Sequence, residues 1–418
     1  MSTVFDLDTW RKTVRGWLEQ HAEPRPGGHP ADRPWGEGSD SVAVFHNLSA
    51  DDEVAILRAN QVWQQAKDDA GYGAVAWPQE WGGAGLSAEH ARVFAEEEAG
   101  FVVPPGAELF SVTVRLVAPT VATFGTAEQS DRFLRPLRRA EMLACQLFSE
   151  PGAGSDLANL SCRAVQDGDE WIVNGQKVWT SGAPHAAYGE LIARTDPDLP
   201  KHRGLTAFLV PLDRPGVEIR PIRQMSGGAS FSEVFFSDVR IPDGLRLGEV
   251  GEGWRVALTT LGFERSHSGS SRRRPGGSWE QLAAAARHFG RSGDPSVRQG
   301  LADVYIGATL LRLNAERAAA AARVGHAVGP EGSIGKLAWT LHMTRLTAVA
   351  TEVLGARLVA DSGEWGAYAW SEHVLGAPGY RIAGGSDEIQ RNIIAERVLG
   401  LPAEPRVDKE IPFRDLRR

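Results

Sequence analysis

The pattern of apolar and polar positions divides the chain into three parts. From Trp10 to about Leu143, apolar residues recur at helical spacing, interrupted by a Pro/Gly-rich segment at 23–38 and a Trp/Gly-rich segment at 76–87. Ser87, at the end of the second break, is of the residue type that caps a helix N-terminus. The first part is therefore predicted to be helical, with one long irregular loop.

Strand signals replace helical spacing between Cys145 and about Leu247. Residues 169–181, DEWIVNGQKVWTS, predict two strands joined at Asn174-Gly175, because this pair adopts the positive φ angles that a type I′ hairpin turn requires. Further strand signals follow at 205–213, 217–222 and 232–241. The middle part is therefore predicted to be a compact β domain.

Helical spacing returns at Trp254 and continues through two long segments rich in Ala and Leu, at 298–324 and 333–359. No repeat of fixed period is found in the sequence. The expected order is helices, a β domain and a helical bundle. The boundaries that this order predicts are 1–144, 145–248 and 249–405, followed by a tail at 406–418.

Length and composition narrow the class of protein. The 418 residues are enough for two or three domains with a large core. Cys145 and Cys162 are too few for a disulfide framework and stand in no CxxC or metal-ligand spacing, which fits a reducing, cytoplasmic setting. The N-terminal sequence lacks a signal-peptide pattern, and no window approaches about 18 unbroken apolar residues, so we expect a soluble protein that is not exported.

Charge and histidine content argue against two further classes. The formal net charge of −8 and the pI near 5.8 argue against a general affinity for nucleic acid. A basic cluster at 271–277, SRRRPGG, is expected to be a solvated loop rather than a phosphate site. The 11 histidines are scattered with no pair at metal-ligand spacing, so no metal is predicted.

Two segments of the middle part are candidates for ligand binding. Residues 148–157, FSEPGAGSDL, combine turn-forming Pro and Gly with serine hydroxyls, and exposed amides in such a turn can hold phosphate oxygens. Taken alone, a plain loop is favoured, because neither P-loop nor GxGxxG spacing is matched. Trp179 and Ser181 are expected on one face of a strand, where an indole and a hydroxyl can support a flat ring. In isolation, the favoured alternative is that Trp179 belongs to the core and that the Ser181 hydroxyl has a hydrogen-bond partner within the protein.

A third candidate lies on the predicted helix at 254–267, WRVALTTLGFERSH. At 100° per residue, Glu264 and Arg265 fall about 60° and about 40° to either side of Leu261, on the apolar stripe. Burying an ionised carboxylate costs several kcal/mol unless it is paired, so this placement is unusual for a helix that merely packs. The alternative is a structural Glu or Arg that reaches out at the helix end, and the pattern leaves both open.

The last candidate is RIAGGSDEIQR at 381–391, where two glycines precede a predicted helix start. Ser386 can cap this helix, and Asp387 and Glu388 suit its positive end. A helix start alone is enough to explain these features. The second interpretation is that the segment forms one wall of an active site.

Four motifs together resemble the acyl-CoA dehydrogenase family. They are SEPGAGSD at 149–156, NGQKVWTSG at 174–182, GFER at 262–265 and GGSDEIQRNIIAERVLGLP at 384–402. The resemblance runs from about Trp63 to Pro402 and implies an α+β multidomain fold, with an N-terminal helical domain, a central β-barrel-like domain and a C-terminal four-helix bundle. It also implies FAD between the β domain and the bundle, reaching a neighbouring subunit in tetrameric members.

The resemblance implies cofactor contacts in both segments of the middle part. In the first loop, Ser149 matches a hydroxyl that bonds the pyrimidine side of the flavin, and Ser155 matches one near the pyrophosphate. Trp179 would pack beside the isoalloxazine. Ser181 stands where the family usually has a threonine that bonds the reactive nitrogen of the flavin. The implied contacts of the first loop are Phe148, Ser149, Gly154 and Ser155.

Two C-terminal segments carry further implied cofactor contacts. Glu352 and Gly355 belong to the segment that reaches the FAD of the neighbouring subunit, although Glu352 replaces the usual glutamine. Ser386 and Glu388 belong to a second contact that follows the glycines. The Arg-x-x-Phe-Gly motif of the family has Ala286 in place of its arginine.

The resemblance also implies where the catalytic acid lies. Many members carry a glutamate at the position of Gly384, but isovaleryl-CoA dehydrogenase and long-chain relatives supply the carboxylate from the first bundle helix, immediately before an arginine. Glu264 before Arg265 is similar to that arrangement. Glu264 is therefore expected to be the base, in apolar surroundings that can raise its pKa, with the Gly384 amide as an oxyanion donor. Arg265 and Ser155 are the implied substrate contacts.

The implied function is FAD-dependent α,β-dehydrogenation of an acyl-CoA thioester, or of an acyl-carrier-protein thioester, to the 2,3-enoyl product. Electrons would pass to an electron-transfer flavoprotein, and a homo-oligomer, tetramer or dimer, or a heteromeric assembly is expected. A base on the first bundle helix suggests a long or branched acyl group. Two rivals stay open: a flavin monooxygenase of the same fold, and a catalytically silent subunit that binds a partner dehydrogenase.

Overall fold

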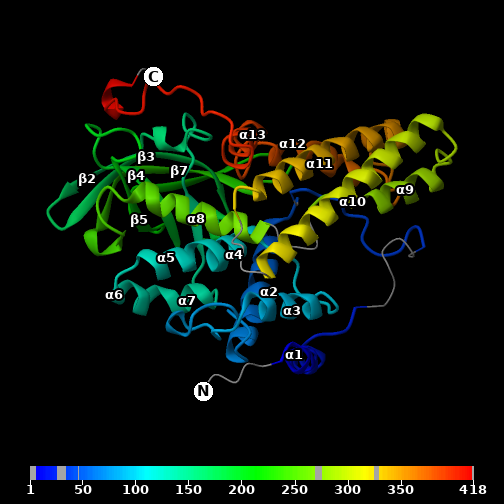
Figure 1. Cartoon of the computed structure of the whole chain (residues 1–418), viewed down its shortest axis with the longest axis horizontal. Helices are drawn as coiled ribbons and strands as arrows, with labels where there is room; N and C mark the ends of the chain where they lie inside the picture. Colours follow the sequence, from blue (N-terminus) through cyan, green and yellow to red (C-terminus); the bar gives the residue numbers. More distant parts are fainter. Residues whose placement is uncertain (1–5, 26–33, 46, 269–274, 324–328, 417–418) are drawn as a thin grey trace.

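The computed structural model describes residues 6–25, 34–45, 47–268, 275–323 and 329–416, and the side chains of all of these except 265–268 and 322–323. Figure 1 shows three regions: a sheet, the helices of the first part below it, and the long helices of the last part beside both. The order of helices, β domain and helical bundle that the sequence predicts is confirmed. Most of the predicted basic loop, 271–274, lies outside the described residues.

The first region packs α1, α2 and α3 around a core that includes Trp10 and Leu18. Ser87 stands at the N-cap of α3 as predicted, but its hydroxyl pairs with Nδ1 of His90 at 2.7 Å rather than with a backbone amide. A widened π-type turn at Thr113–Val117, a feature frequent at functional sites, joins α4 to α5 without a break. The helices are α1 (Leu7–His21), α2 (Ala50–Asp69), α3 (Ala88–Glu98), α4 (Glu108–Val112), α5 (Ala118–Phe124), α6 (Ala127–Gln129) and α7 (Arg135–Arg138).

The middle region is one sheet whose strands pair in the order β6, β7, β3, β2, β4, β5, β8, with β1 paired to β4 beside this path. Strands β4 and β5 are buried along almost their whole length, and α8 packs across β5. The sheet is therefore covered on the side that faces the helices. The strands are β1 (Ala144–Leu147), β2 (Arg163–Asp167), β3 (Glu170–Ser181), β4 (Tyr188–Arg194), β5 (Leu205–Pro211), β6 (Val217–Ile222), β7 (Phe231–Pro242) and β8 (Arg246–Leu247).

The predicted hairpin at Asn174-Gly175 is wrong. Residues on both sides of this pair form one continuous strand, β3, and the turn lies earlier, between Asp167 and Glu170. Gly175 sits in a β-bulge where the pairing with β7 shifts register, and a side chain there would collide with Cys162. Asn174 exchanges hydrogen bonds of 2.9 and 3.0 Å with Asp238 of β7. The Asn-Gly pair marks a bulge, which the local turn signal does not distinguish from a hairpin.

The last region is built around α11, which packs against α9, α10, α12 and α13. Its core includes Leu346 and Trp370. Residues 34–45 cross from the first region onto this bundle, where the Trp35 ring stacks on His288. The helices are α8 (Gly253–Ser268), α9 (Trp279–His288), α10 (Pro295–Arg323), α11 (Gly332–Leu354), α12 (Trp370–Tyr380) and α13 (Asp387–Ile393).

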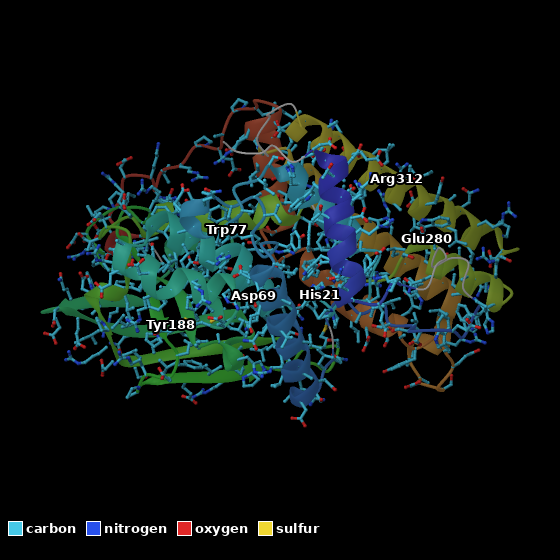
Figure 2. All side chains as sticks on the ribbon, turned by 90° about the horizontal axis from the view of Figure 1, so that it is seen from below. His21, Asp69, Trp77, Tyr188, Glu280 and Arg312 are labelled. Atoms are coloured by element: carbon cyan, nitrogen blue, oxygen red, sulfur yellow. The ribbon has the colours of Figure 1, made fainter. Side chains whose placement is uncertain are left out.

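Seen from below in Figure 2, α1 runs between the two halves of the molecule. Trp77 and Tyr188 lie in the half that contains the sheet, and Glu280 and Arg312 lie in the bundle half. Within the described ranges, no helix has both the length and the apolar content to cross a membrane. Nor does the described part of the chain bring three or more His, Cys, Asp or Glu side chains together at a place that could hold a metal ion.

Candidate active site

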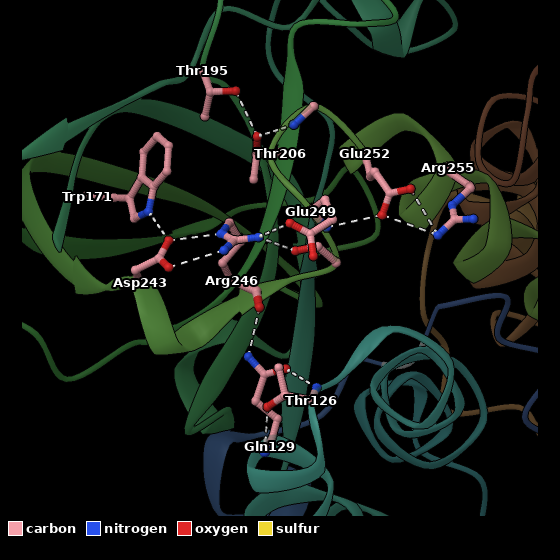
Figure 3. A network of polar contacts seen from close by, with 12 residues as sticks. Thr126, Gln129, Trp171, Thr195, Thr206, Asp243, Arg246, Glu249, Glu252 and Arg255 are labelled. Atoms are coloured by element: carbon pink, nitrogen blue, oxygen red, sulfur yellow. Dashed lines mark hydrogen bonds and ion pairs between the residues drawn. The ribbon is translucent and has the colours of Figure 1, made fainter. Parts of the chain in front are cut away.

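Helix α8, which carries Glu264, is anchored at its start by a network of polar contacts (Figure 3). Arg246 bonds Asp243 at 2.9 Å, and this contact lowers the pKa of the Asp243 carboxyl. Gln129 of α6 donates to the carbonyl of Arg246 at 2.8 Å, tying the first region to the same point. A side chain at Gly253 would lie 2.6 Å from the backbone nitrogen of Thr206 in β5. The start of α8 is therefore pressed onto the sheet and fixed in direction.

The face of α8 that is buried differs from the predicted stripe. It is centred near Ala257 and Thr260 rather than on Leu261, and Leu258 is 44% exposed. Thr260 donates to the buried Glu190 of β4 at 2.6 Å, so a polar pair occupies the middle of the helix–sheet contact. Counting apolar residues cannot find such a face, because part of it is polar.

Glu264 lies one turn after Thr260, within about 40° of it around the helix, and is half-buried. Glu264 therefore lies beside the buried face of α8. It does so because it follows Thr260 by one turn, and the predicted stripe centred on Leu261 is not the buried face. Arg265 lies in α8, but its side chain is outside the described residues.

The structure brings Glu264 and Gly384 together. A β-carbon built on Gly384 would lie 3.2 Å from Oε1 of Glu264. Gly384 has a φ of +64°, in the left-handed region that glycine tolerates best. In the described part of the chain no acceptor pairs with its amide N–H. Gly384 thus leaves room for a carboxylate from another helix and presents an amide beside it.

Contacts from three directions hold the loop around Gly384. Lys336 of α11 donates to the carbonyl of Gly385 at 2.6 Å. Gln390 donates to the carbonyls of Gly384 and Gly385 at 3.1 and 3.2 Å. Asp387 is buried and accepts from Arg381 at 2.7 Å. Burial lowers the pKa of Lys336, while the charges of Asp387 and Glu264 oppose that shift, so Lys336 acts electrostatically on the same site.

The end of β3 presents the two predicted ring-binding residues. Trp179 is 60% exposed and has a φ of +62°, at a register shift in the pairing with β7. Such a large exposed apolar side chain on a strained backbone is unusual in a strand and favours a binding role over the core alternative. Ser181, two residues on, directs its hydroxyl to Oε1 of Glu108 at 3.0 Å. An exposed indole beside a hydroxyl suits the flat, hydrogen-bonding ring of a flavin.

A buried ion pair fixes the Gly-rich turn beside β3. Lys177 is fully buried and donates to Glu150 at 2.8 Å and to the carbonyl of Phe148 at 2.9 Å. Burial acts to raise the pKa of Glu150, but Lys177 and the amides of Ser161 and Cys162 outweigh it, so the pKa is lowered. The Phe148 side chain is core, which leaves its backbone as the part that could face a ligand.

The remaining predicted residues of the turn follow this core segment. Ser149 is half-buried, and its carbonyl accepts from Val178 of β3 at 2.9 Å. Gly154 and Ser155 are exposed, and a β-carbon at Gly154 would meet no atom within 4 Å. The turn therefore presents open backbone and hydroxyls, as an anion-binding loop would. Its role with FAD stays a prediction.

The four C-terminal candidates do not lie together. Ser386 caps α13 by accepting from the amide of Ile389, and Glu388 is exposed on the first turn of that helix. Glu352 lies in the last turn of α11, about 24 Å along the helix from Lys336, and Gly355 directly follows the helix. Their predicted contact would therefore serve a different site from the one at Glu264.

Three residues at this site were not found from the sequence. Glu108 bonds Ser181, Lys336 holds the glycine loop, and Tyr380 is surrounded by protein near two carboxylates. Tyr380 ends α12, and its ring stacks on Phe45 of the segment that crosses from the first region. None stands in a motif, and each acts on a residue far away in the chain, so no local signal marks them.

A helical region, a β domain and a helical bundle, in this order, are the three domains of an acyl-CoA dehydrogenase. The models of the N-terminal, middle and C-terminal domains of acyl-CoA dehydrogenases match residues 44–141, 145–239 and 251–399. The chain belongs to the acyl-CoA dehydrogenase family and is an oxidoreductase. The family predicted from the four motifs is confirmed.

Among similar proteins, the acyl-CoA dehydrogenase IpdE1 of Mycobacterium tuberculosis is 39% identical over 96% of this chain and 99% of its own length. A solved structure named "Tcur3481-Tcur3483 steroid ACAD" superposes with a TM-score of 0.71 at 28% identity, covering 95% of this chain and 98% of that one. The ChsE4-ChsE5 complex from Mycobacterium tuberculosis gives a TM-score of 0.69 at 28% identity, covering 97% of this chain and 100% of that one.

Proposed function

We propose that this chain catalyses FAD-dependent α,β-dehydrogenation of an acyl thioester, with Glu264 as the base. The observation that carries the proposal is the position of the Glu264 carboxylate, 3.2 Å from where a side chain at Gly384 would begin. This places one carboxylate and one backbone amide at the same point, from elements about 120 residues apart in the chain. A base and an oxyanion donor are what proton removal next to a carbonyl needs.

In the proposed reaction, Glu264 takes the α proton of the thioester, and this proton then resides on its carboxylate. The Gly384 N–H donates a hydrogen bond to the thioester carbonyl oxygen as negative charge grows there. Such donors contribute roughly 2.7 to 4 kcal/mol in acyl-transfer enzymes. Bound FAD would supply the acceptor for the hydride that leaves the β carbon. Lys336 holds the glycine loop through Gly385 while charge develops.

The residues at the end of β3 fit this cofactor. The exposed indole of Trp179 offers a stacking face, and the hydroxyl of Ser181 lies beside it. The loop from Phe148 to Ser155 supplies hydroxyls and open backbone for the polar parts of FAD. Glu352 and Gly355 would contact the FAD of a neighbouring subunit, and Ser386 and Glu388 would form a second cofactor contact after the glycines.

The substrate and partners follow from the same proposal. The acyl group is carried by coenzyme A or by a carrier protein, and Arg265 and Ser155 contact this thioester substrate. An electron-transfer flavoprotein receives the electrons. One similar solved structure is named a steroid ACAD, which supports a bulky acyl group. Two similar structures carry two protein names each, and one of them is named a complex, which supports a heteromeric assembly beside the expected homotetramer or dimer. Cytoplasmic location stays a prediction.

Anaerobic mixing of the purified, flavin-loaded protein with a panel of acyl-CoAs tests the proposal. At least one thioester is expected to bleach the flavin absorbance, and Glu264→Gln is expected to slow bleaching by about 100-fold or more. Glu316→Gln, the same change in an exposed surface pair with Arg312, is the control. Unchanged bleaching by Glu264→Gln would contradict the base assignment.

The two rivals give other results in the same experiment. A flavin monooxygenase would consume oxygen with a flavin reductant and ignore every acyl-CoA. A silent subunit would carry no flavin, or would carry it without bleaching. Recovery of bleaching on addition of a second chain would then favour the silent subunit.

A further inference from the structure

The C-terminal tail, residues 406–416 of the described chain, returns to the β domain after the bundle (Figure 1). It lies beyond the segments that the family models match. The amide of Phe413 donates to the carbonyl of Leu199, and the amide of Arg414 donates to the carbonyl of Pro197, both at 3.0 Å. These carbonyls belong to the connection between β4 and β5. The tail is therefore bonded to the β domain through its backbone.

A first side-chain link runs from the tail to the end of the Gly-rich turn, residues 149–156. The Phe413 ring is buried under the guanidinium of Arg194, whose carbon lies 3.9 Å from the ring centroid, a favourable contact of a cation with an aromatic face. Arg194 is buried as well and donates to the carbonyls of Ala158 and Leu160 at 2.6 and 3.2 Å. The tail thus packs on an arginine that holds the backbone directly after the turn.

A second link passes through Lys201 in the connection between β4 and β5. Its Nζ donates to Oδ2 of Asp156, the last residue of the turn, at 2.9 Å and to Oδ2 of Asp408 in the tail at 2.8 Å. The Lys201 side chain is only 12% exposed, so the ion pairs are partly shielded from water. Arg194 also donates to the backbone carbonyl of Lys201 at 2.8 Å. The two links therefore form one network between tail and turn.

The glycine content of the turn makes this hold relevant to ligand binding. A β-carbon at Gly152 or Gly154 would meet no atom within 4 Å, so the backbone there is open. Glycine loses more conformational freedom than any other residue when it becomes ordered. A turn that is ordered before the ligand arrives spares the ligand this cost, which raises the affinity. Holding the end of the turn therefore affects any ligand that contacts Ser155.

We propose that the C-terminal tail holds the Gly-rich turn in its ligand-binding conformation through Arg194 and Lys201, and that this hold raises the affinity of the chain for FAD. Arg194 and Lys201 are positioning residues, because each acts on the cofactor through the turn. The effect on FAD rests on the proposed function, in which the turn contacts the polar parts of FAD. The hold on the turn rests on the contacts of Arg194 and Lys201 alone and is measurable without cofactor.

A double variant of the full chain, Asp408→Ala with Phe413→Ala, removes the tail side chain from each link. In the cofactor-free protein, hydrogen exchange at the amides of residues 157–162 is expected to become at least about tenfold faster than in wild type, because the segment opens more often. Titration of FAD into the same protein is expected to give a dissociation constant at least about fivefold higher.

The matched control changes two other side chains of the tail. Glu410→Ala with Arg414→Ala removes the exposed ion pairs with Arg203 and Asp198, which lie on the connection between β4 and β5 rather than on the turn. Exchange and FAD affinity should both stay near wild type. Lys201→Met should weaken FAD binding, whereas Lys201→Arg keeps a cation between the two carboxylates and should retain most of the affinity.

Each readout can overturn its part of the proposal. Unchanged exchange at 157–162 in the double variant, even with a lower free energy of unfolding, would show that the tail only covers the β domain. Faster exchange with an unchanged dissociation constant would overturn the effect on FAD. If wild type binds no FAD, the proposed function fails, whereas the exchange comparison still decides whether the tail holds the turn.

Discussion

The carboxylate of Glu264 lies close against the position that a side chain on residue 384 would take. A β-carbon on Gly384 would lie 3.2 Å from Oε1 of Glu264, closer than most such contacts. The two residues come from α8 and from the loop before α13. Because the glycine has no side chain, a carboxylate can approach this loop from α8.

Gly384→Ala should therefore lower activity more than stability alone explains. Alanine at a φ of +64° costs about 1–2 kcal/mol in backbone strain, and its methyl group would also displace the Glu264 carboxylate. The flavin bleaching rate is expected to fall at least about tenfold. Gly400→Ala is the matched control, because Gly400 has a φ of +69° with no atom within 4 Å of the added carbon. Equal bleaching rates in the two variants would show that the contact with Glu264 is unimportant.

Lys336→Met should change the pH dependence of bleaching. The Lys336 ammonium acts electrostatically on Glu264, and its positive charge favours the ionised carboxylate. Without it, the acidic limb of the rate profile is expected to move to higher pH, by on the order of half a unit to one unit. Lys12→Met, on the exposed face of α1, should leave the profile in place. If Lys336→Met only lowers the bleaching rate and the acidic limb stays at the same pH, Lys336 acts solely by holding Gly385.

Stability should fall between pH 6.5 and pH 8 because of Glu190. Burial raises the pKa of Glu190 to about 8 from an ordinary 4.5, so the folded state holds its proton more tightly than the unfolded chain. That stabilisation is complete below pH 4.5 and is lost as pH rises through 8. Burial lowers the pKa of His373 to about 4, so its stabilisation is lost only as pH falls below 6.5. Above pH 6.5 the contribution of His373 to the free energy of unfolding is therefore constant, whereas that of Glu190 still falls.

Urea unfolding across that window measures the effect. The free energy of unfolding of wild type is expected to fall by up to about 1.4 kcal/mol per pH unit. Glu190→Gln should remove most of this slope, because an amide does not ionise. Oε2 of Glu190 has no hydrogen-bond partner in the described part of the chain, so the amide breaks no bond at that atom. An identical slope in both proteins would exclude Glu190 as the source.

Lys177→Met should destabilise the protein by about 3–5 kcal/mol. Lys177 is fully buried, so its loss leaves Glu150 as a buried carboxylate with only hydroxyl and amide partners. Arg220→Met breaks an exposed pair with Glu218 and should cost no more than about 1 kcal/mol. Chemical denaturation of both variants gives the comparison. Adding Glu150→Gln to Lys177→Met should recover part of the loss, and a double variant less stable than the single one would refute this account.

Trp179→Gly should lower the retention of FAD without lowering the stability of the cofactor-free protein. Glycine relieves the positive φ of +62°, worth roughly 1–2 kcal/mol, and little packing is lost because the indole is 60% exposed. The cofactor-free protein is therefore expected to be as stable as wild type or more stable. FAD content after gel filtration is expected to fall severalfold, because the stacking face is gone. A stability loss with full FAD content would assign Trp179 to the core.

The sequence alone predicted the order of the three regions and the family, and it singled out Glu264 as a charged residue on the predicted apolar stripe of its helix. These depend on local spacing and on short motifs, which a chain carries whatever its partners are. The hairpin at Asn174-Gly175 failed because the same pair serves a bulge opposite Asp238. The buried face of α8 differs from the predicted stripe because Thr260 bonds Glu190, which makes this face partly polar.

Only the tertiary structure decided which residues meet. It placed Glu264 against Gly384, Glu108 against Ser181 and Lys336 against Gly385, each pair drawn from different elements. Contacts at such sequence separations depend on how helices and sheet pack, and packing is set by the sum of many weak interactions rather than by any local pattern. Local patterns therefore determined the parts of this enzyme, and packing determined the geometry of its site.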